Sequence, residues 1–136
     1  MTYKTKKQKI TNSRDVAAIL YAILDAEEFV DRDKEHFWTI GFDIKNRIKY
    51  IELVSLGCLT STITHPRETF RFAIMQGVAS IIIAHNHPSG DKTPSDIDKV
   101  FTGRLKQAGE ILGIPLLDHI ILGHDEHYSF ADHNEI

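Results

Sequence analysis

Four polar residues that lie close together in the sequence have the chemistry of a metal site. His85 and His87 stand one residue apart, and Ser95 and Asp98 follow after a turn rich in proline, glycine and charged residues. Imidazole nitrogens and carboxylate oxygens are ligands that zinc takes in proteins, and three protein ligands leave a fourth tetrahedral position for water. The pattern therefore favours a metal that takes part in a reaction over one that only holds the fold together.

The same spacing also has a simpler interpretation. In a polar surface loop, His85 and His87 would hydrogen-bond backbone groups, and Asp98 would only be a favourable acid in the first turn of a helix. Cysteine does not extend the site, because a single cysteine, Cys58, permits neither an internal disulfide nor a thiolate-rich zinc centre. We predict that Cys58 is a structural thiol in a strand or at its end.

A strand before the turn and a helix after it must bring these residues together. The apolar run 78–86 has the length of a strand and is predicted to lie at the centre of a sheet. Residues i and i+2 of a strand share a face, so both imidazoles can reach one point. The following helix is predicted to have Thr93 as its N-cap and Pro94 at its first position, and to run towards Gly113. Its first turn then places the serine beside the aspartate.

The remaining segments predict one layered domain. Apolar spacing and turn residues indicate a helix over 13–25, a hairpin with strands over 35–43 and 47–56, a helix over 66–77, and strands over 115–123 and 127–132. Helices that alternate with strands over 136 residues predict a single α/β or α+β domain, with helices packed on one sheet. We divide the chain into a basic N-terminal tip over 1–10, expected to be mobile, and a folded domain over 11–136.

Composition narrows the classes of function. The net charge of −3 argues against a domain that grips nucleic acid by neutralising phosphates, although four lysines (Lys4, Lys6, Lys7 and Lys9) make the N-terminal tip basic. No apolar run approaches the roughly 20 residues of a membrane span, and the basic tip lacks the apolar core of a secretory signal. We therefore expect a cytoplasmic protein without a membrane partner.

The segment "AHNHPSGDKTPSDID" resembles a known motif. The order His, His, Ser and Asp at this spacing, with proline after the second histidine, matches the JAMM signature of the JAB/MPN metalloproteases. Together with "HPRETF" before it and "LLDHIILG" after it, the motif is similar to the RadC-like family of bacterial JAB-domain proteins, over residues 12–131. The resemblance implies the JAB/MPN architecture, which is cytidine-deaminase-like. Typical RadC-like proteins place a helical module before this domain.

The resemblance also implies a role for each motif residue. Its zinc ligands fall on His85, His87 and Asp98, with one zinc ion in each chain. The serine of the motif, here Ser95, hydrogen-bonds the reacting carbonyl or the tetrahedral intermediate. A glutamate from an early strand holds the metal-bound water and acts as general acid and base. That position falls on Glu35, whereas its rival Glu52 stands in the second strand and does not match the family pattern.

Two residues of "LLDHIILG" are expected to support the site. His119 is predicted to be a buried or supporting histidine rather than a ligand. Asp118 beside it is predicted to orient a metal-bound imidazole, because ligand histidines usually donate their other nitrogen to a carboxylate or a carbonyl.

The main functional prediction is a zinc-dependent hydrolase that attacks an amide in a peptide or isopeptide bond of a protein or peptide substrate. The alternative is a non-enzymatic DNA repair or recombination accessory with a structural or vestigial metal site. The family was historically labelled as DNA repair, and the basic tip gives this alternative weak support. A third interpretation keeps the metal but takes a phosphodiester as substrate, which a single metal without an arginine in the motif makes less attractive. The oligomeric state stays open.

Overall fold

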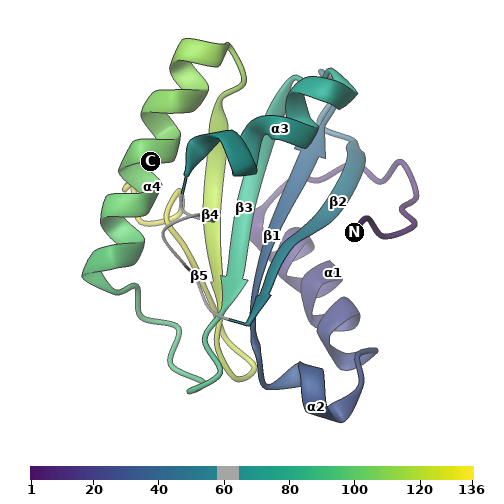
Figure 1. Cartoon of the computed structure of the whole chain (residues 1–136), viewed down its shortest axis with the longest axis vertical. Coiled ribbons are helices and arrows are strands. Elements are labelled where there is room, and N and C mark those ends of the chain that lie inside the picture. The colour runs from purple at the N-terminus through teal and green to yellow at the C-terminus, as the bar shows by residue number, and fades with distance from the viewer. Residues whose placement is uncertain (58–64) are drawn as a thin grey trace.

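A five-stranded mixed sheet forms the centre of the fold, with the strands in the order β2-β1-β3-β4-β5 (Figure 1). The strands are β1 (Glu35–Phe42), β2 (Ile48–Gly57), β3 (Ser80–Asn86), β4 (Leu116–Leu122) and β5 (His127–Ser129). Strands β3 and β4 run parallel, and the other neighbours are antiparallel. The structure is a computed structural model that describes residues 1–57 and 65–136, so Cys58 lies outside the described residues.

Helices cover both faces of the sheet. They are α1 (Ser13–Asp25), the short α2 (Phe29–Arg32), α3 (Pro66–Gln76) and α4 (Asp96–Leu112). Helix α1 lies behind the sheet in Figure 1, and α3 and α4 lie in front of it. The predicted class, an α/β fold with helices packed on one sheet, is confirmed. In the part of the chain that the structure describes, no helix is long and apolar enough to cross a membrane.

The alternation of side chains along the strands produces two hydrophobic clusters. Trp38, Ile40 and Phe42 of β1 pack with the buried residues of α1 on one face. Phe37, on the opposite face, packs with residues of α3 and α4 such as Phe101. Every residue of β3 is buried, as expected for a central strand covered on both faces. The carboxyl end of β3 is therefore held from both sides where the histidine pair begins.

Most elements agree with the sequence prediction within a few residues. The hairpin closes through Asn46, which has a φ of 59° and lies in a turn. Helix α3 begins at Pro66 and is capped after Gln76 by Gly77, whose left-handed φ of 62° suits a residue without Cβ. The predicted start of α4 was wrong, because Pro94 lies before the helix, whose first residue is Asp96. Ser95 rather than Thr93 caps the helix, because its hydroxyl accepts a hydrogen bond from the backbone N–H of Asp98. The last strand is also shorter than predicted, and helix α2 was not predicted.

The N-terminal segment, residues 1–10, lies along the outer edge of β2. Backbone hydrogen bonds join Tyr3 N–H to the carbonyl of Ile51 at 3.0 Å and Ile48 N–H to the carbonyl of Gln8 at 2.8 Å. Ile10 is buried against the core that α1 covers. These contacts shield an edge strand that would otherwise present free hydrogen-bonding groups. The mobility of this segment in solution stays a prediction.

Candidate metal centre

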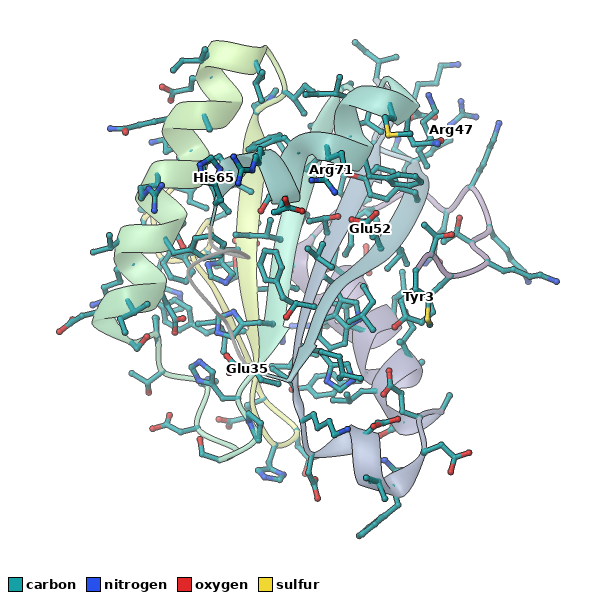
Figure 2. All side chains as sticks on the ribbon, in the orientation of Figure 1. Tyr3, Glu35, Arg47, Glu52, His65 and Arg71 are labelled. Atoms are coloured by element: carbon teal, nitrogen blue, oxygen red, sulfur yellow. The ribbon has the colours of Figure 1, made fainter. Side chains whose placement is uncertain are left out.

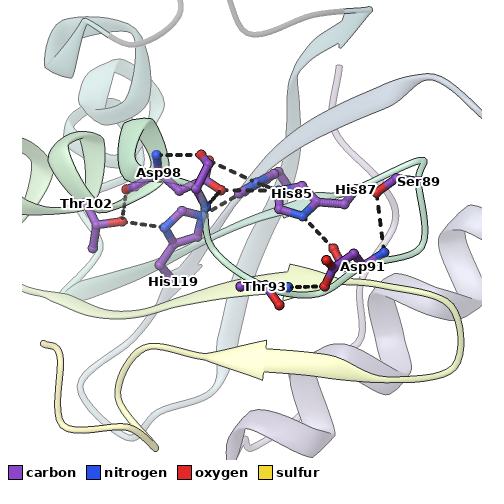
Figure 3. Close-up of polar contacts among 9 residues, drawn as sticks. His85, His87, Ser89, Asp91, Thr93, Asp98, Thr102 and His119 are labelled. Carbon is purple, nitrogen blue, oxygen red and sulfur yellow. Dashed lines mark hydrogen bonds and ion pairs between the residues drawn. The ribbon is translucent and has the colours of Figure 1, made fainter.

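His85, His87 and Asp98 converge on one point at the carboxyl end of β3 (Figure 3). The Nε2 atoms of the two histidines are 2.9 Å apart. The carboxylate oxygens of Asp98 lie 3.3 Å from Nε2 of His85 and 3.2 Å from Nε2 of His87. His85 and Asp98 are buried and His87 is partly exposed, so the cluster opens to solvent on the His87 side.

The turn after β3 fixes the orientation of His87. Its Nδ1 lies 2.7 Å from the backbone carbonyl oxygen of Asp91. A carbonyl only accepts hydrogen bonds, so Nδ1 carries the hydrogen and Nε2 presents its lone pair to the cluster in the neutral ring. The hydrogen bond with Asp98 raises the pKa of His87 more than burial lowers it, and the negative charge of Glu35 adds to the increase.

Asp98 is positioned by the start of α4. Its carboxylate accepts a hydrogen bond from the backbone N–H of Ser95 at 2.9 Å, which completes a reciprocal capping box. Burial alone would raise the pKa of this carboxyl. Hydrogen bonds with His85 and His87 and from Ser95 outweigh burial and hold the pKa of Asp98 well below its ordinary value. Asp98 is therefore an ionised carboxylate whose position is set by the start of the helix that it helps to cap.

Ser95 lies beside this cluster and is exposed. Its Oγ accepts the hydrogen bond from Asp98 N–H at 3.1 Å, so the hydroxyl hydrogen is available to a further acceptor. The serine predicted to assist the reaction is therefore adjacent to the predicted ligands, through a helix cap rather than a shared helix face.

Glu35 reaches the same end of the sheet from β1. Phe37 pairs with His85 in antiparallel register, the last pair of the ladder at this end. The same register continued by two residues puts Glu35 opposite His87 on the same side of the sheet, and the charge of Glu35 raises the pKa of His87, as expected for neighbours. Figure 2 shows Glu35 at the lower end of the sheet and Glu52 higher up, beside Arg71 of α3. Burial raises the pKa of Glu52, which belongs to this second location. The structure places Glu35, not its rival, near the histidine pair.

Asn86 braces Glu35, a connection that we did not predict from the sequence. Its side-chain oxygen accepts a hydrogen bond from the backbone N–H of His36 at 2.6 Å. Its amide nitrogen donates to the carbonyl of Lys34 at 3.0 Å. Asn86 therefore holds the residues on both sides of Glu35 while it stands between the two histidines in sequence. The alternation along β3 predicts that it faces away from them, but only the pairing with β1 shows what it contacts.

The expected support from β4 comes from a different residue. Asp118 does not contact a histidine ring of the cluster, so its predicted role was wrong: its carboxylate binds Ser129 Oγ at 2.6 Å and the backbone N–H of Ala131 at 2.9 Å. His119 is fully buried, and its Nε2 lies 2.8 Å from Nδ1 of His85. Burial lowers the pKa of His119 well below its ordinary value.

Thr102 of α4 hydrogen-bonds the other ring nitrogen of His119, Nδ1, through its Oγ1 (Figure 3). Sequence reasoning missed it, although its position four residues after Asp98 is a signal, because residues i and i+4 share a helix face.

The three groups fit a small divalent cation. Ligands about 2.0–2.1 Å from a tetrahedral zinc ion lie about 3.3 Å from one another. The two Nε2 atoms are 2.9 Å apart. Oδ1 of Asp98 lies 3.3 Å from Nε2 of His85, and Oδ2 lies 3.2 Å from Nε2 of His87, so each histidine has a carboxylate oxygen close to that separation. Two nitrogens and one carboxylate oxygen, one of them partly open to solvent, are also the donor set of catalytic zinc sites. His85, His87 and Asp98 therefore form a candidate metal site.

The fold and this candidate metal site define a JAB domain. A family model of the RadC-like JAB domain matches residues 10–135, and the chain belongs to this family. Similar proteins include a "UPF0758 protein" from Chlorobaculum parvum, 44% identical over 96% of this chain and 57% of the relative, and one from Moorella thermoacetica, 47% identical over 92% of this chain and 52% of the relative. A third, from Methanosarcina mazei, is 43% identical over 93% of this chain and 53% of the relative.

The chain spans about half the length of the curated relatives that it matches. The names of these relatives state no activity. The family is therefore established, and the activity has to be argued from the site.

Proposed function

We propose that this domain is a zinc-dependent hydrolase in which water attacks the amide of a peptide or isopeptide bond. One observation carries the proposal. The side chains of His85, His87 and Asp98 converge at one point, and the β1–β3 register continued past Phe37 and His85 brings a further carboxylate, that of Glu35, opposite His87, whose pKa its charge raises. A structural metal site would need only the ligands, whereas a hydrolytic site also needs a base beside them.

Each residue has a distinct task in this proposal. Zinc held by these three residues would lower the pKa of water to about 7 and so supply hydroxide at neutral pH. Glu35 takes the proton from the attacking water and returns it to the leaving amine. Ser95 donates its hydroxyl hydrogen to the oxygen on which negative charge develops, an interaction worth about 2.7–4 kcal/mol where single donors have been removed from other enzymes.

A protein or peptide is the substrate class that we infer. The signature resembles that of the JAB/MPN metalloproteases, and the net charge of −3 does not favour a polyanionic substrate.

The test combines metal analysis with hydrolysis by two variants. Wild-type protein, Glu35→Gln and the control Glu110→Gln are loaded with zinc, dialysed and analysed for metal. Glu110 is exposed on α4, so Glu110→Gln makes the same change of charge away from the site. Each protein is then assayed against a fluorogenic peptide library and a lysine-linked isopeptide. We expect about one zinc per chain in all three proteins, and a loss of hydrolysis of at least about 100-fold only in Glu35→Gln.

Two outcomes would contradict parts of this proposal. A wild-type protein that retains no zinc would remove its basis. A Glu35→Gln variant as active as Glu110→Gln would show that another group is the base.

A further inference from the structure

The buried imidazole of His119 connects the metal site to the interior of α4. On one side its Nε2 lies 2.8 Å from Nδ1 of His85, and on the other its Nδ1 lies 2.5 Å from Oγ1 of Thr102. The Thr102 hydroxyl in turn lies 2.7 Å from the backbone carbonyl oxygen of Asp98. Two predicted ligands, His85 and Asp98, are thus joined by a continuous chain of hydrogen bonds behind the site (Figure 3).

Donor and acceptor chemistry gives this chain a direction. The backbone carbonyl of Asp98 can only accept a hydrogen bond, so the Thr102 hydroxyl donates its single hydrogen to this carbonyl. The Thr102 oxygen then accepts a hydrogen bond from Nδ1–H of His119. A neutral imidazole with hydrogen on Nδ1 has a lone pair on Nε2. Nε2 of His119 therefore accepts from Nδ1–H of His85. The hydrogen of His85 is then on Nδ1, and its Nε2 lone pair faces the cluster.

The opposite direction would disable the site. If Thr102 donated to His119, the His119 ring would carry hydrogen on Nε2 and donate to Nδ1 of His85. The neutral His85 ring would then carry its hydrogen on Nε2, the atom that faces His87 and Asp98. A metal cannot bind a ring nitrogen that carries hydrogen.

We propose that His119 is a positioning residue which, held by Thr102, selects the tautomer in which His85 offers Nε2 to the metal. This inference rests on the proposed function in one respect only: it assumes that His85, His87 and Asp98 bind a metal ion. His87 obtains the same tautomer from a backbone carbonyl, that of Asp91. His85 lies within the sheet beside β4, so its Nδ1 hydrogen-bonds the side chain of His119 on that strand instead of a backbone carbonyl.

The packing around His119 keeps its ring in this orientation. The ring is fully buried and stacks on Phe130 with centroids 4.7 Å apart and planes 9° from parallel. Stacking and two hydrogen bonds fix the ring plane, so the two nitrogens cannot exchange places without breaking contacts. Supporting residues of metal ligands typically change metal affinity by about 10–100-fold when they are replaced.

The experiment compares Thr102→Val with Thr102→Ser, and adds His119→Phe. Valine keeps the shape of threonine and removes the acceptor for Nδ1–H of His119, whereas serine keeps the hydroxyl. Zinc affinity is measured by competition with a chromogenic chelator, and the histidine tautomers by ¹⁵N NMR of the metal-free and zinc-loaded proteins. We expect hydrogen on Nδ1 of His119 in the wild-type protein and in Thr102→Ser. We expect a shift to Nε2 in Thr102→Val, and zinc affinity about 10–100-fold lower in Thr102→Val and His119→Phe.

Each result decides the question. Equal zinc affinity in wild-type protein and Thr102→Val, or hydrogen on Nε2 of wild-type His119, would overturn the inference. A His119→Phe variant that fails to fold leaves the decision to the two Thr102 variants. If wild-type protein takes up no zinc, the proposed function fails, and the tautomers of the metal-free wild-type and Thr102→Val proteins still support or overturn the assignment to His119.

Discussion

At the residue scale, Asp98 combines two roles that depend on the same carboxylate. It accepts the backbone N–H of Ser95 at the start of α4, and it faces the two histidines of the cluster. The start of the helix therefore determines where this carboxylate lies, and its charge complements the positive end of the helix dipole. A second acid of the same turn, Asp96, is exposed and shares only the dipole interaction.

This difference predicts unequal effects of two similar substitutions. Asp98→Asn removes the charged ligand, so we expect zinc uptake to fall from about one equivalent to a small fraction of it. Asp96→Asn removes an equal charge from the same turn and should leave zinc uptake unchanged. Metal analysis after equilibrium dialysis measures both. Full zinc occupancy in Asp98→Asn would exclude this carboxylate as a ligand.

The convergence of the histidine pair and the aspartate could be predicted from the sequence, because it depends on local structure. Same-face positions in a strand and the first turn of a helix follow from short-range geometry. The roles of Thr102 and Asn86 could not be predicted in the same way. Thr102 matters because β4 brings His119 against it, and Asn86 matters because β1 pairs with β3 in one register. Such contacts depend on strand order, which no local pattern contains.

At the element scale, the pairing of β1 with β3 places Glu35, the proposed base, near the candidate metal site. Asn86 reinforces this pairing where the regular ladder ends, through its contacts with the backbone of His36 and Lys34. These contacts restrain the backbone on both sides of Glu35. The side chains of His85 and His87 do not depend on these contacts, since other groups hold both rings.

Asn86→Ala should therefore separate catalysis from metal binding. We expect zinc uptake to persist and hydrolysis to fall by at least about tenfold, because a misplacement of about 1 Å can cost 10²-fold. The free energy of unfolding should fall by about 1–3 kcal/mol, since a buried N–H loses its acceptor. Asn12→Ala, which removes the N-cap of α1, serves as the control because it should lower stability by about 1 kcal/mol without changing activity. Equal activity in the two variants would contradict a role for Asn86 in placing Glu35.

Tyr21 joins helix α1 to the turn between β4 and β5. Its hydroxyl lies 2.8 Å from the carbonyl of Gly123 and 2.7 Å from that of Glu126, in the turn between β4 and β5. Burial, and then the negative charges of Asp125 and Glu126, raise the pKa of Tyr21 to about 12. The unfolded chain has a tyrosine pKa of about 10, so deprotonation favours unfolding.

This shift predicts a loss of stability in alkali. The contribution of Tyr21 is complete below about pH 10 and disappears as the pH rises through about 12. Tyr21→Phe should be less stable than wild type near neutral pH, by about 1 kcal/mol for the lost hydrogen bonding. The difference between the two proteins should shrink between about pH 10 and 12. Urea unfolding across this range measures it, and a constant difference would show that the Tyr21 hydroxyl titrates alike in both states.

At the scale of the whole molecule, the layered fold was predictable and the course of the N-terminal segment was not. Alternating apolar runs and turn residues are enough to indicate helices on a sheet. Residues 1–10 carry no such periodicity, and their backbone hydrogen bonds with β2 become visible only once β2 is known to be an edge strand. The lysines of this segment are exposed while its backbone is bound. A deletion of residues 1–10 would therefore change the fold and the charge together.

Replacing Lys4, Lys6, Lys7 and Lys9 with glutamine tests the nucleic-acid alternative without removing the backbone of the segment. The change makes the net charge of −3 more negative by four and leaves the contacts of residues 1–10 with β2 in place. Under the proposed hydrolytic function, hydrolysis and zinc content should equal those of the wild-type protein, and neither protein should bind DNA measurably at 150 mM salt.

A DNA-binding accessory would instead show affinity that falls steeply with salt, because each neutralised phosphate contributes a slope of about −0.9 to log K against log salt. Fluorescence anisotropy with single-stranded and duplex DNA at several salt concentrations makes the comparison. Salt-dependent binding by the wild-type protein that is lost in the glutamine variant would favour the accessory role, and hydrolysis retained by that variant would show that the two activities are independent.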